Sequence, residues 1–271
     1  MTSLVARVWP AASVLGLALS VPLVAGAEMP TGREIMELVE ARDDGDQMTQ
    51  DMEMILIDKR GNRRERMIRM MSRDVGEDTQ SIMFFLSPAP VKDTGFLTYD
   101  YDSPDEDDDQ WLFLPALKKT KRIATGDKSG SFMGSDFTYS DMTDRDLDRY
   151  DYRLLQQDEV AGHRVWVVEA IPNSDDEIKE TGYTKSVLFV RQDNHVVVRA
   201  KSWVKKGKRQ KYMDVKSLEL IDGIWVSTET HMTTKKAKST LHKTVLKAHN
   251  VRFNQGHSED LFTVRKLERG P

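Results

Sequence analysis

Residues 183–232 decide the expected fold, and they read YTKSVLFVRQDNHVVVRAKSWVKKGKRQKYMDVKSLELIDGIWVSTETHM. Apolar and polar residues alternate through this stretch, and turn-forming groups such as Gln192-Asp193-Asn194 and Asp222-Gly223 interrupt it. Alternation with a period of two is typical of strands with one buried face, and closely spaced turns indicate antiparallel hairpins. This stretch therefore predicts consecutive strands that pair with their neighbours in sequence.

The same pattern extends in both directions along the chain. Further strands are expected at residues 48–56, 63–73, 81–86, 95–99, 110–114, 150–157, 163–171 and 239–253. Thr31 and Glu34 have capping-box spacing ahead of an apolar helical stripe, and Ser258 is placed to cap a short final helix. We expect a mainly β protein of about eleven antiparallel strands that curls into a barrel or part-barrel, because curling protects sheet edges. Helices are expected only at the termini and in residues 126–144.

The N-terminal residues have the organisation of a signal peptide. Arg7 precedes an apolar stretch at residues 14–24, and Ala25-Gly26-Ala27 offers small residues for cleavage. We expect residues 1–27 to be removed after Ala27, leaving residues 28–271 as one periplasmic domain. The alternative is an uncleaved membrane anchor, for which the apolar run is short. The chain has no Cys, so its core alone must hold the exported fold.

No catalytic or metal-binding motif is evident. The six histidines lack metal-ligand spacing, there is no Cys to join them, and no GxSxG segment is present. A triad assembled in space stays possible from the sequence alone. The acidic residues at 102–109 could supply oxygen ligands to calcium, but they lack the spacing and glycine of a calcium loop. We interpret them as a solvated loop, and we expect no metal, no cofactor and no enzymatic activity.

Basic residues cluster at three places along the chain. The first cluster is Lys118, Lys119, Lys121 and Arg122, and the others lie within residues 205–211 and 235–238. Lys and Gly are ordinary residues of hairpin turns, which explains the clusters without a function. The functional alternative is docking to anionic lipid headgroups or to an acidic partner. Export argues against nucleic acid as that partner.

Several expected strands are apolar on both faces. Phe84-Phe85 and Leu112-Phe113-Leu114 are examples, and methionines are frequent in the first three strands. One face of such a strand can join the core, whereas the other needs a helix, a partner or a ligand to cover it. Methionine adapts its shape to variable apolar ligands. The excess of apolar residues thus indicates either packing under helices or an apolar binding site.

Two segments of the sequence resemble a known family. Residues 111–123 read WLFLPALKKTKRI and residues 131–142 read SFMGSDFTYSDM. Together they resemble the outer-membrane lipoprotein-sorting family, in the LolA/LolB-like superfamily and in the branch associated with RND/MMPL-type exporters. The resemblance covers the mature chain. It implies a half-open, curved antiparallel barrel with helices covering its concave face, and acyl chains held in an apolar cavity between them. The closing Arg of the housekeeping lipoprotein carrier cannot be placed on any one position of this sequence.

The resemblance implies a periplasmic carrier that moves lipid or lipoprotein acyl chains towards the outer membrane. Its expected partners are an RND/MMPL-type exporter in the inner membrane and an acceptor in the outer membrane. Lys118, Lys119, Lys121 and Arg122 are the expected docking residues, and Gly130 and Gly134 suit a flexible lid. We expect the cavity to be lined by Met54, Leu56, Phe84, Leu86, Phe96, Trp111, Phe113, Phe132, Met133 and Phe137. The alternatives are an exporter adaptor that carries no lipid and an envelope hydrolase.

Overall fold

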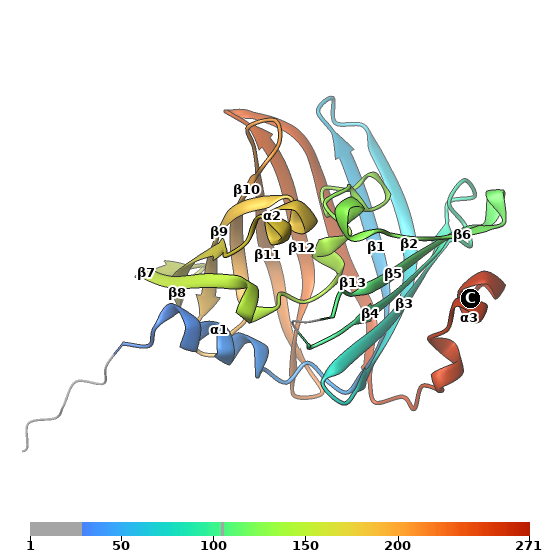
Figure 1. The fold of residues 1–271 in the computed structure, drawn as a ribbon, viewed down its shortest axis with the longest axis horizontal. Coiled ribbons are helices and arrows are strands. Elements are labelled where there is room, and N and C mark those ends of the chain that lie inside the picture. The colour runs from blue at the N-terminus through green and yellow to red at the C-terminus, as the bar shows by residue number, and fades with distance from the viewer. Residues whose placement is uncertain (1–28, 104–105) are drawn as a thin grey trace, which may run out of the picture.

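The computed structural model describes residues 29–103 and 106–271, so the expected signal peptide lies outside the described residues. These residues form one 13-stranded antiparallel sheet that is strongly curved (Figure 1). The strand order across it is β6-β5-β4-β3-β2-β1-β13-β12-β11-β10-β9-β8-β7, so only β1 and β13 pair without being neighbours in sequence. The expected fold class is confirmed, and the number of strands is somewhat higher than expected.

The elements have the following bounds. The strands are β1 (Gln47–Asp58), β2 (Arg63–Val75), β3 (Asp78–Ser87), β4 (Gly95–Asp100), β5 (Asp109–Leu114), β6 (Lys119–Arg122), β7 (Tyr150–Val160), β8 (His163–Pro172), β9 (Tyr183–Arg191), β10 (Val197–Val204), β11 (Arg209–Ile221), β12 (Ile224–Lys236) and β13 (Ser239–Phe253). The α-helices are α1 (Gly32–Glu40), α2 (Asp175–Thr181) and α3 (Val264–Arg269). Short 3-10 turns are η1 (Pro115–Leu117), η2 (Thr125–Asp127), η3 (Phe132–Gly134), η4 (Ser140–Met142), η5 (Leu147–Arg149) and η6 (Glu259–Leu261).

Helix α1 begins as the sequence predicts. The Thr31 hydroxyl accepts a hydrogen bond from the Glu34 amide, and the Glu34 carboxylate accepts one from the Thr31 amide, which completes a capping box. The end of the chain differs from the expectation. Ser258 precedes only the 3-10 turn η6, whereas α3 is capped by Thr263, whose hydroxyl accepts from the Lys266 amide.

Helix α2 is absent from the sequence-based expectation. Ser174 caps it through a hydrogen bond from the Glu177 amide, and Gly182 ends it in the left-handed conformation. This Ser-x-x-Glu spacing with a terminal Gly was the available signal, but the helix is too short for a clear apolar period. Strand β6 is likewise not predicted by alternation, because its sequence Lys-Thr-Lys-Arg contains no apolar residue.

The two faces of the sheet are covered by different parts of the chain. Helices α1 and α2 and residues 123–149 lie over the concave face, whereas α3 packs outside β4 and β5 (Figure 1). The resemblance correctly implied helices over the concave face. None of the helices formed by the described residues is long and apolar enough to cross a membrane.

Candidate functional site on the concave face

Pairing between strands brings apolar residues from half of the sheet together on the concave face. Met54 pairs with Arg66 and Leu246, and the neighbouring pairs continue this face through β3, β4 and β5. Directly paired residues point to the same side of a sheet, so the register of the strand pairs determines which residues form this surface. The buried apolar residues on this surface are Met54, Leu56, Ile68, Met83, Phe85, Phe96, Leu112 and Met232.

Residues 123–142, which we call the covering segment, fill the space above this surface. Phe132 is 1% exposed, and its ring lies 5.0 Å from that of Phe96 and 6.3 Å from that of Phe85. Tyr139 of the same segment packs edge-on against Phe132 at 5.7 Å. Phe137 is 8% exposed and joins the same cluster. The apolar surface of the sheet is therefore occupied by the chain's own side chains.

Besides Gln110, Tyr183 and Lys211, which bond to Tyr139 and Asp141 of the covering segment, three sets of polar contacts hold this segment in place. Arg66 of β2 donates from Nη1 to the Met133 carbonyl at 2.7 Å, and its guanidinium lies 5.7 Å from the Phe85 ring centre. Desolvation by burial lowers the pKa of Arg66, although a guanidinium remains charged in proteins. Arg66 was not predicted as a functional residue. Its position two residues before the inward-facing Ile68 was the signal that could have found it.

Asp136 forms the second attachment of the covering segment. Its carboxylate accepts hydrogen bonds from Thr234 at 2.5 Å and from Thr244 at 2.8 Å, and its amide donates to Thr244 at 2.9 Å. His242 lies beside it, with Nδ1 3.3 Å from Oδ1. Asp136 is 3% exposed, so these hydrogen bonds replace the water that the carboxylate loses on burial.

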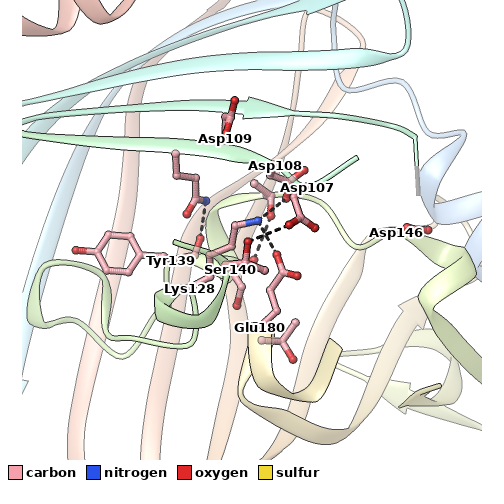
Figure 2. A network of polar contacts seen from close by, with 12 residues as sticks. Asp107, Asp108, Asp109, Lys128, Tyr139, Ser140, Asp146 and Glu180 are labelled. Atoms are coloured by element: carbon pink, nitrogen blue, oxygen red, sulfur yellow. Dashed lines mark hydrogen bonds and ion pairs between the residues drawn. The ribbon is translucent and has the colours of Figure 1, made fainter. Parts of the chain in front are cut away.

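A buried ion-pair network forms the third attachment (Figure 2). Lys128 is 1% exposed, and its Nζ lies 2.5 Å from Glu180 Oε1 of α2 and 3.7 Å from Asp108 Oδ2. Asp109 of the same loop pairs with Arg122, with Nε at 2.7 Å. The expectation of a solvated acidic loop was therefore wrong for Asp108 and Asp109, because both carboxylates are partly buried and form ion pairs, Asp108 with Lys128 and Asp109 with Arg122. Among the described residues, no group of three or more His, Cys, Asp or Glu is arranged to hold a metal ion.

A cavity of about 310 Å³ opens where the connection after α1 meets β1, β2 and β12. Its lining mixes Trp225 and Gln50 with the carboxylates of Asp44, Asp74 and Asp144. Burial raises the pKa of each of these three carboxyl groups. This cavity is more polar than the acyl-chain cavity expected from the resemblance.

A further carboxyl group, Asp100 at the end of β4, lies next to Asp144. Asp100 accepts a hydrogen bond from the Asp144 amide at 2.7 Å. Burial raises its pKa to about 8, and repulsion from Asp108 and Asp144 adds to the effect. This raised pKa favours the protonated, uncharged form of Asp100.

The structure divides the expected cavity residues between the two faces. Met54, Leu56, Phe96, Phe132, Met133 and Phe137 belong to the concave cluster. The other residues, Phe84, Leu86, Trp111 and Phe113, lie on the opposite face in a cluster with Phe262 and Leu267 next to α3. The sequence could not separate these groups, since β3, β4 and β5 carry apolar residues on both faces.

The expected docking residues lie at the β5–β6 turn and on β6. Lys118, Lys119, Lys121 and Arg122 are all exposed. Lys121 pairs with Asp127 at 3.3 Å, and Arg122 pairs with Asp109. Lys118 lines an open groove of about 720 Å³ on the outer side, together with Phe113, Glu268 and the C-terminal residues. The neighbouring Leu117 is 64% exposed.

Comparison with known proteins identifies the family of this chain. A family model described as an uncharacterized protein matches residues 77–269. The chain is 31% identical to a solved candidate outer membrane lipoprotein-sorting protein domain from Vibrio parahaemolyticus, with a TM-score of 0.79, covering 88% of this chain and 98% of that one. A DUF1329 family protein from Desulfovibrio piger also has a TM-score of 0.79, at 29% identity, covering 87% of this chain and 97% of that one. The chain belongs to the DUF1329 family.

The fold of this DUF1329 protein is similar to that of a LolA superfamily protein. A LolA superfamily protein from Nitrosomonas europaea has a TM-score of 0.65 at 16% identity, covering 88% of this chain and all (100%) of that one. At this identity the likeness shows the fold alone. Among curated proteins, no sequence matches this chain. One of these structural neighbours is named as a candidate lipoprotein-sorting domain and another as a LolA superfamily protein, in agreement with the resemblance in the sequence.

Proposed function

We propose that this DUF1329 protein is an exported, non-catalytic carrier that binds acyl chains of a lipid or lipoprotein on its concave face. The observation that carries the proposal is the apolar surface under the covering segment. It is continuous across β1 to β5 and β12, and what covers it is a segment of short 3-10 turns rather than a packed helix. An acyl chain that took the place of Phe132 and Phe137 would find an apolar site already formed by the sheet.

The energetics of transfer explain why such a carrier needs partners and no cofactor. Burial is worth about 0.8 kcal/mol per methylene, so a chain of about sixteen carbons gains roughly 12 kcal/mol relative to water. The hydrocarbon of a membrane offers about the same gain, so extraction is nearly neutral. Direction must come from elsewhere. We propose an RND/MMPL-type exporter at the inner membrane, with Lys118, Lys119, Lys121 and Arg122 as docking residues, and an acceptor at the outer membrane.

Binding requires the covering segment to move, because it fills the apolar surface. Arg66, Asp136 and Lys128 hold this segment through hydrogen bonds and an ion pair, which can break without unfolding the sheet. The proposed ligand-binding residues are Met54, Leu56 and Phe96 of the sheet, and Phe132, Met133 and Phe137 are the residues it displaces. In this proposal the structure represents the closed state, in which the covering segment occupies the apolar surface.

Lipid analysis of the protein purified from cell envelopes tests the proposal. Native mass spectrometry should detect bound lipid in the wild type, and Phe132→Asp should reduce it, since the carboxylate would lie in the apolar site. Phe113→Asp is the matched control, because Phe113 is an aromatic residue on the opposite face. Retention of lipid by Phe132→Asp, or equal loss from both variants, would reject this binding site.

One observation favours a second candidate function. The concave apolar cluster is filled by the chain's own side chains, as expected for an adaptor that joins an exporter and carries no lipid. The two functions differ in whether the purified protein contains lipid and in whether the covering segment opens. An adaptor would contain no lipid and would keep the covering segment closed when it binds the exporter.

The proposed export makes a separate prediction about the mature protein. If residues 1–27 form a signal peptide cleaved after Ala27, the protein from the periplasmic fraction should begin at Glu28. The intact mass of the purified protein measures this directly, and a mass that includes the first residues would instead indicate an uncleaved anchor.

A further inference from the structure

Hairpin turns rich in basic residues meet at one end of the sheet. Arg209 pairs with Lys236, Lys236 pairs with Ser239 across the next turn, and Asp58 pairs with His242. This register places the β10–β11, β12–β13 and β1–β2 turns side by side, as Figure 1 shows at the top of the sheet. The basic residues of this end, which we call the basic rim, are Lys59, Arg60, Arg63, Arg64, Lys205, Lys206, Lys208, Arg209, Lys235, Lys236 and Lys238.

The opposite end of the sheet carries the opposite charge. The β2–β3 turn contains Glu77 and Asp78, the β11–β12 turn contains Asp222, and the connection after α1 contains Asp43 and Asp46. The formal net charge of the whole chain is −4, so the basic rim is a local concentration of positive charge rather than a general property. A molecule with this charge distribution orients its basic rim towards a negatively charged surface.

The charges of the basic rim are available to a partner. Lys205, Lys206 and Lys208 are exposed, and within the described ranges none of these three side chains forms an ion pair. The nearby carboxylate of Asp58 accepts hydrogen bonds from the Arg60 and Asn62 amides. The eleven basic residues of the basic rim outnumber this carboxylate, so the rim keeps a net positive charge.

Aromatic side chains adjoin the basic rim on the outer face. Trp203 lies between two ammonium groups, with Lys185 Nζ 4.7 Å and Lys201 Nζ 4.5 Å from its ring centre. Tyr212 on the next strand has Lys235 Nζ at 4.8 Å. Trp and Tyr side chains next to lysines are typical of surfaces that lie at the interface between water and lipid.

We propose that the basic rim is a docking surface for an anionic phospholipid bilayer. Charge complementarity indicates this partner, because a row of basic hairpin turns at one end of a sheet can contact a plane of headgroup phosphates at several points simultaneously. The adjoining Trp203 and Tyr212 suit the boundary between headgroups and hydrocarbon, which a purely electrostatic contact with an acidic protein does not require. The proposal does not depend on lipid carriage, since a non-carrying adaptor could dock in the same way.

Vesicle sedimentation with the mature chain tests the proposal. The protein should bind vesicles of equal parts phosphatidylglycerol and phosphatidylcholine, and should not bind phosphatidylcholine alone. Raising the salt from about 0.1 M to about 1 M should abolish binding, because the Debye length falls from ~10 Å to ~3 Å. Each lysine near an anionic surface contributes about 1 kcal/mol, or roughly fivefold in partitioning, so Lys205→Glu/Lys206→Glu/Lys208→Glu should weaken binding by about 100-fold or more.

A matched triple variant separates docking from net charge. Lys216→Glu/Arg252→Glu/Arg265→Glu makes the same change in charge at exposed positions away from the basic rim. This control should keep vesicle binding within a fewfold of wild type. Equal loss in both triple variants, equal binding to phosphatidylcholine, or no binding to phosphatidylglycerol vesicles at low salt would overturn the proposal. Circular dichroism of both variants checks that they are folded.

Discussion

Replacing Phe132 by alanine removes the side chain that occupies the centre of the concave apolar cluster. The ring is 1% exposed and contacts the rings of Phe85, Phe96 and Tyr139. The substitution keeps the backbone of the covering segment and the attachments through Arg66 and Asp136. It therefore leaves a cavity of ring size above the sheet without releasing the segment.

The cost of this cavity can be set against the gain from a ligand that fills it. Truncating a buried Phe to Ala costs about 3–5 kcal/mol of unfolding free energy. A ligand at about 100 times its dissociation constant returns roughly 2.7 kcal/mol. We therefore expect Phe132→Ala to be destabilised by about 3–5 kcal/mol alone, and to recover about 2.7 kcal/mol, more than half of that loss, with a saturating single-chain amphiphile.

Phe84→Ala is the matched control for this experiment. Phe84 is 0% exposed and lies on the opposite face next to α3, so the two truncations cost similar amounts. Urea unfolding, with and without a single-chain lysophospholipid below its micelle concentration, gives the free energy in each case. Stabilisation by the lipid should be greater in Phe132→Ala than in the wild type or in Phe84→Ala. If both truncations respond to lipid alike, the concave apolar surface is not the binding site.

Three further predictions concern the polar groups of the interior. Arg66→Leu should speed proteolysis and hydrogen exchange of residues 131–142 while costing only about 1–3 kcal/mol of stability, the penalty for the lost hydrogen bond; unchanged exchange there would contradict its role. Lys128→Met should cost about 1.5–3 kcal/mol, because Glu180 loses its ion pair with Lys128 but keeps Arg149 at 3.4 Å, and Lys128→Met/Glu180→Leu should be more stable than the single variant in thermal unfolding. Because the pKa of Asp100 is raised to about 8, its contribution to stability is present in full below its unfolded pKa and is lost as the pH rises through about 8. Urea unfolding should show stability falling across this window by at most about 1.4 kcal/mol per pH unit, and Asp100→Asn should flatten that fall.

The sequence was sufficient to predict the fold class because β strands leave a local signal. Alternation with a period of two and closely spaced turns located most strands, and the capping box at Thr31 located the first helix. Strand β6 lacked such a signal, and in α2 the Ser174–Glu177 spacing is not followed by a clear apolar period. The four residues of β6 are polar or charged, and α2 is only seven residues long.

The candidate site was only partly predictable, because the side of the sheet on which a residue lies is set by pairing. Phe84 and Phe85 are neighbours in β3 and both are 0% exposed, yet they point to opposite faces. The β2–β3 register, which includes a bulge between Met67 and Ile68, decides which one meets Phe132. A sequence without known pairing cannot supply that information.

The polar attachments of the covering segment were not predictable for a different reason. Lys128 and Glu180 are 52 residues apart in the chain, and Asp136 and Thr244 are 108 apart. In the sequence Lys128 follows a basic cluster and resembles any exposed lysine. Only the folded chain shows that it is buried between α2 and the acidic loop.

In the proposed mechanism an acyl chain replaces the covering segment on the concave face, and a reversible covalent lock tests this replacement. The chain contains no Cys, so Asp136→Cys/Thr244→Cys would place the only two thiols at side chains that already touch. Native mass spectrometry after exposure to lipid vesicles then compares the oxidised and reduced forms. We expect the reduced form to take up lipid and the disulfide-locked form to take up none. Equal lipid uptake by the two forms would contradict it.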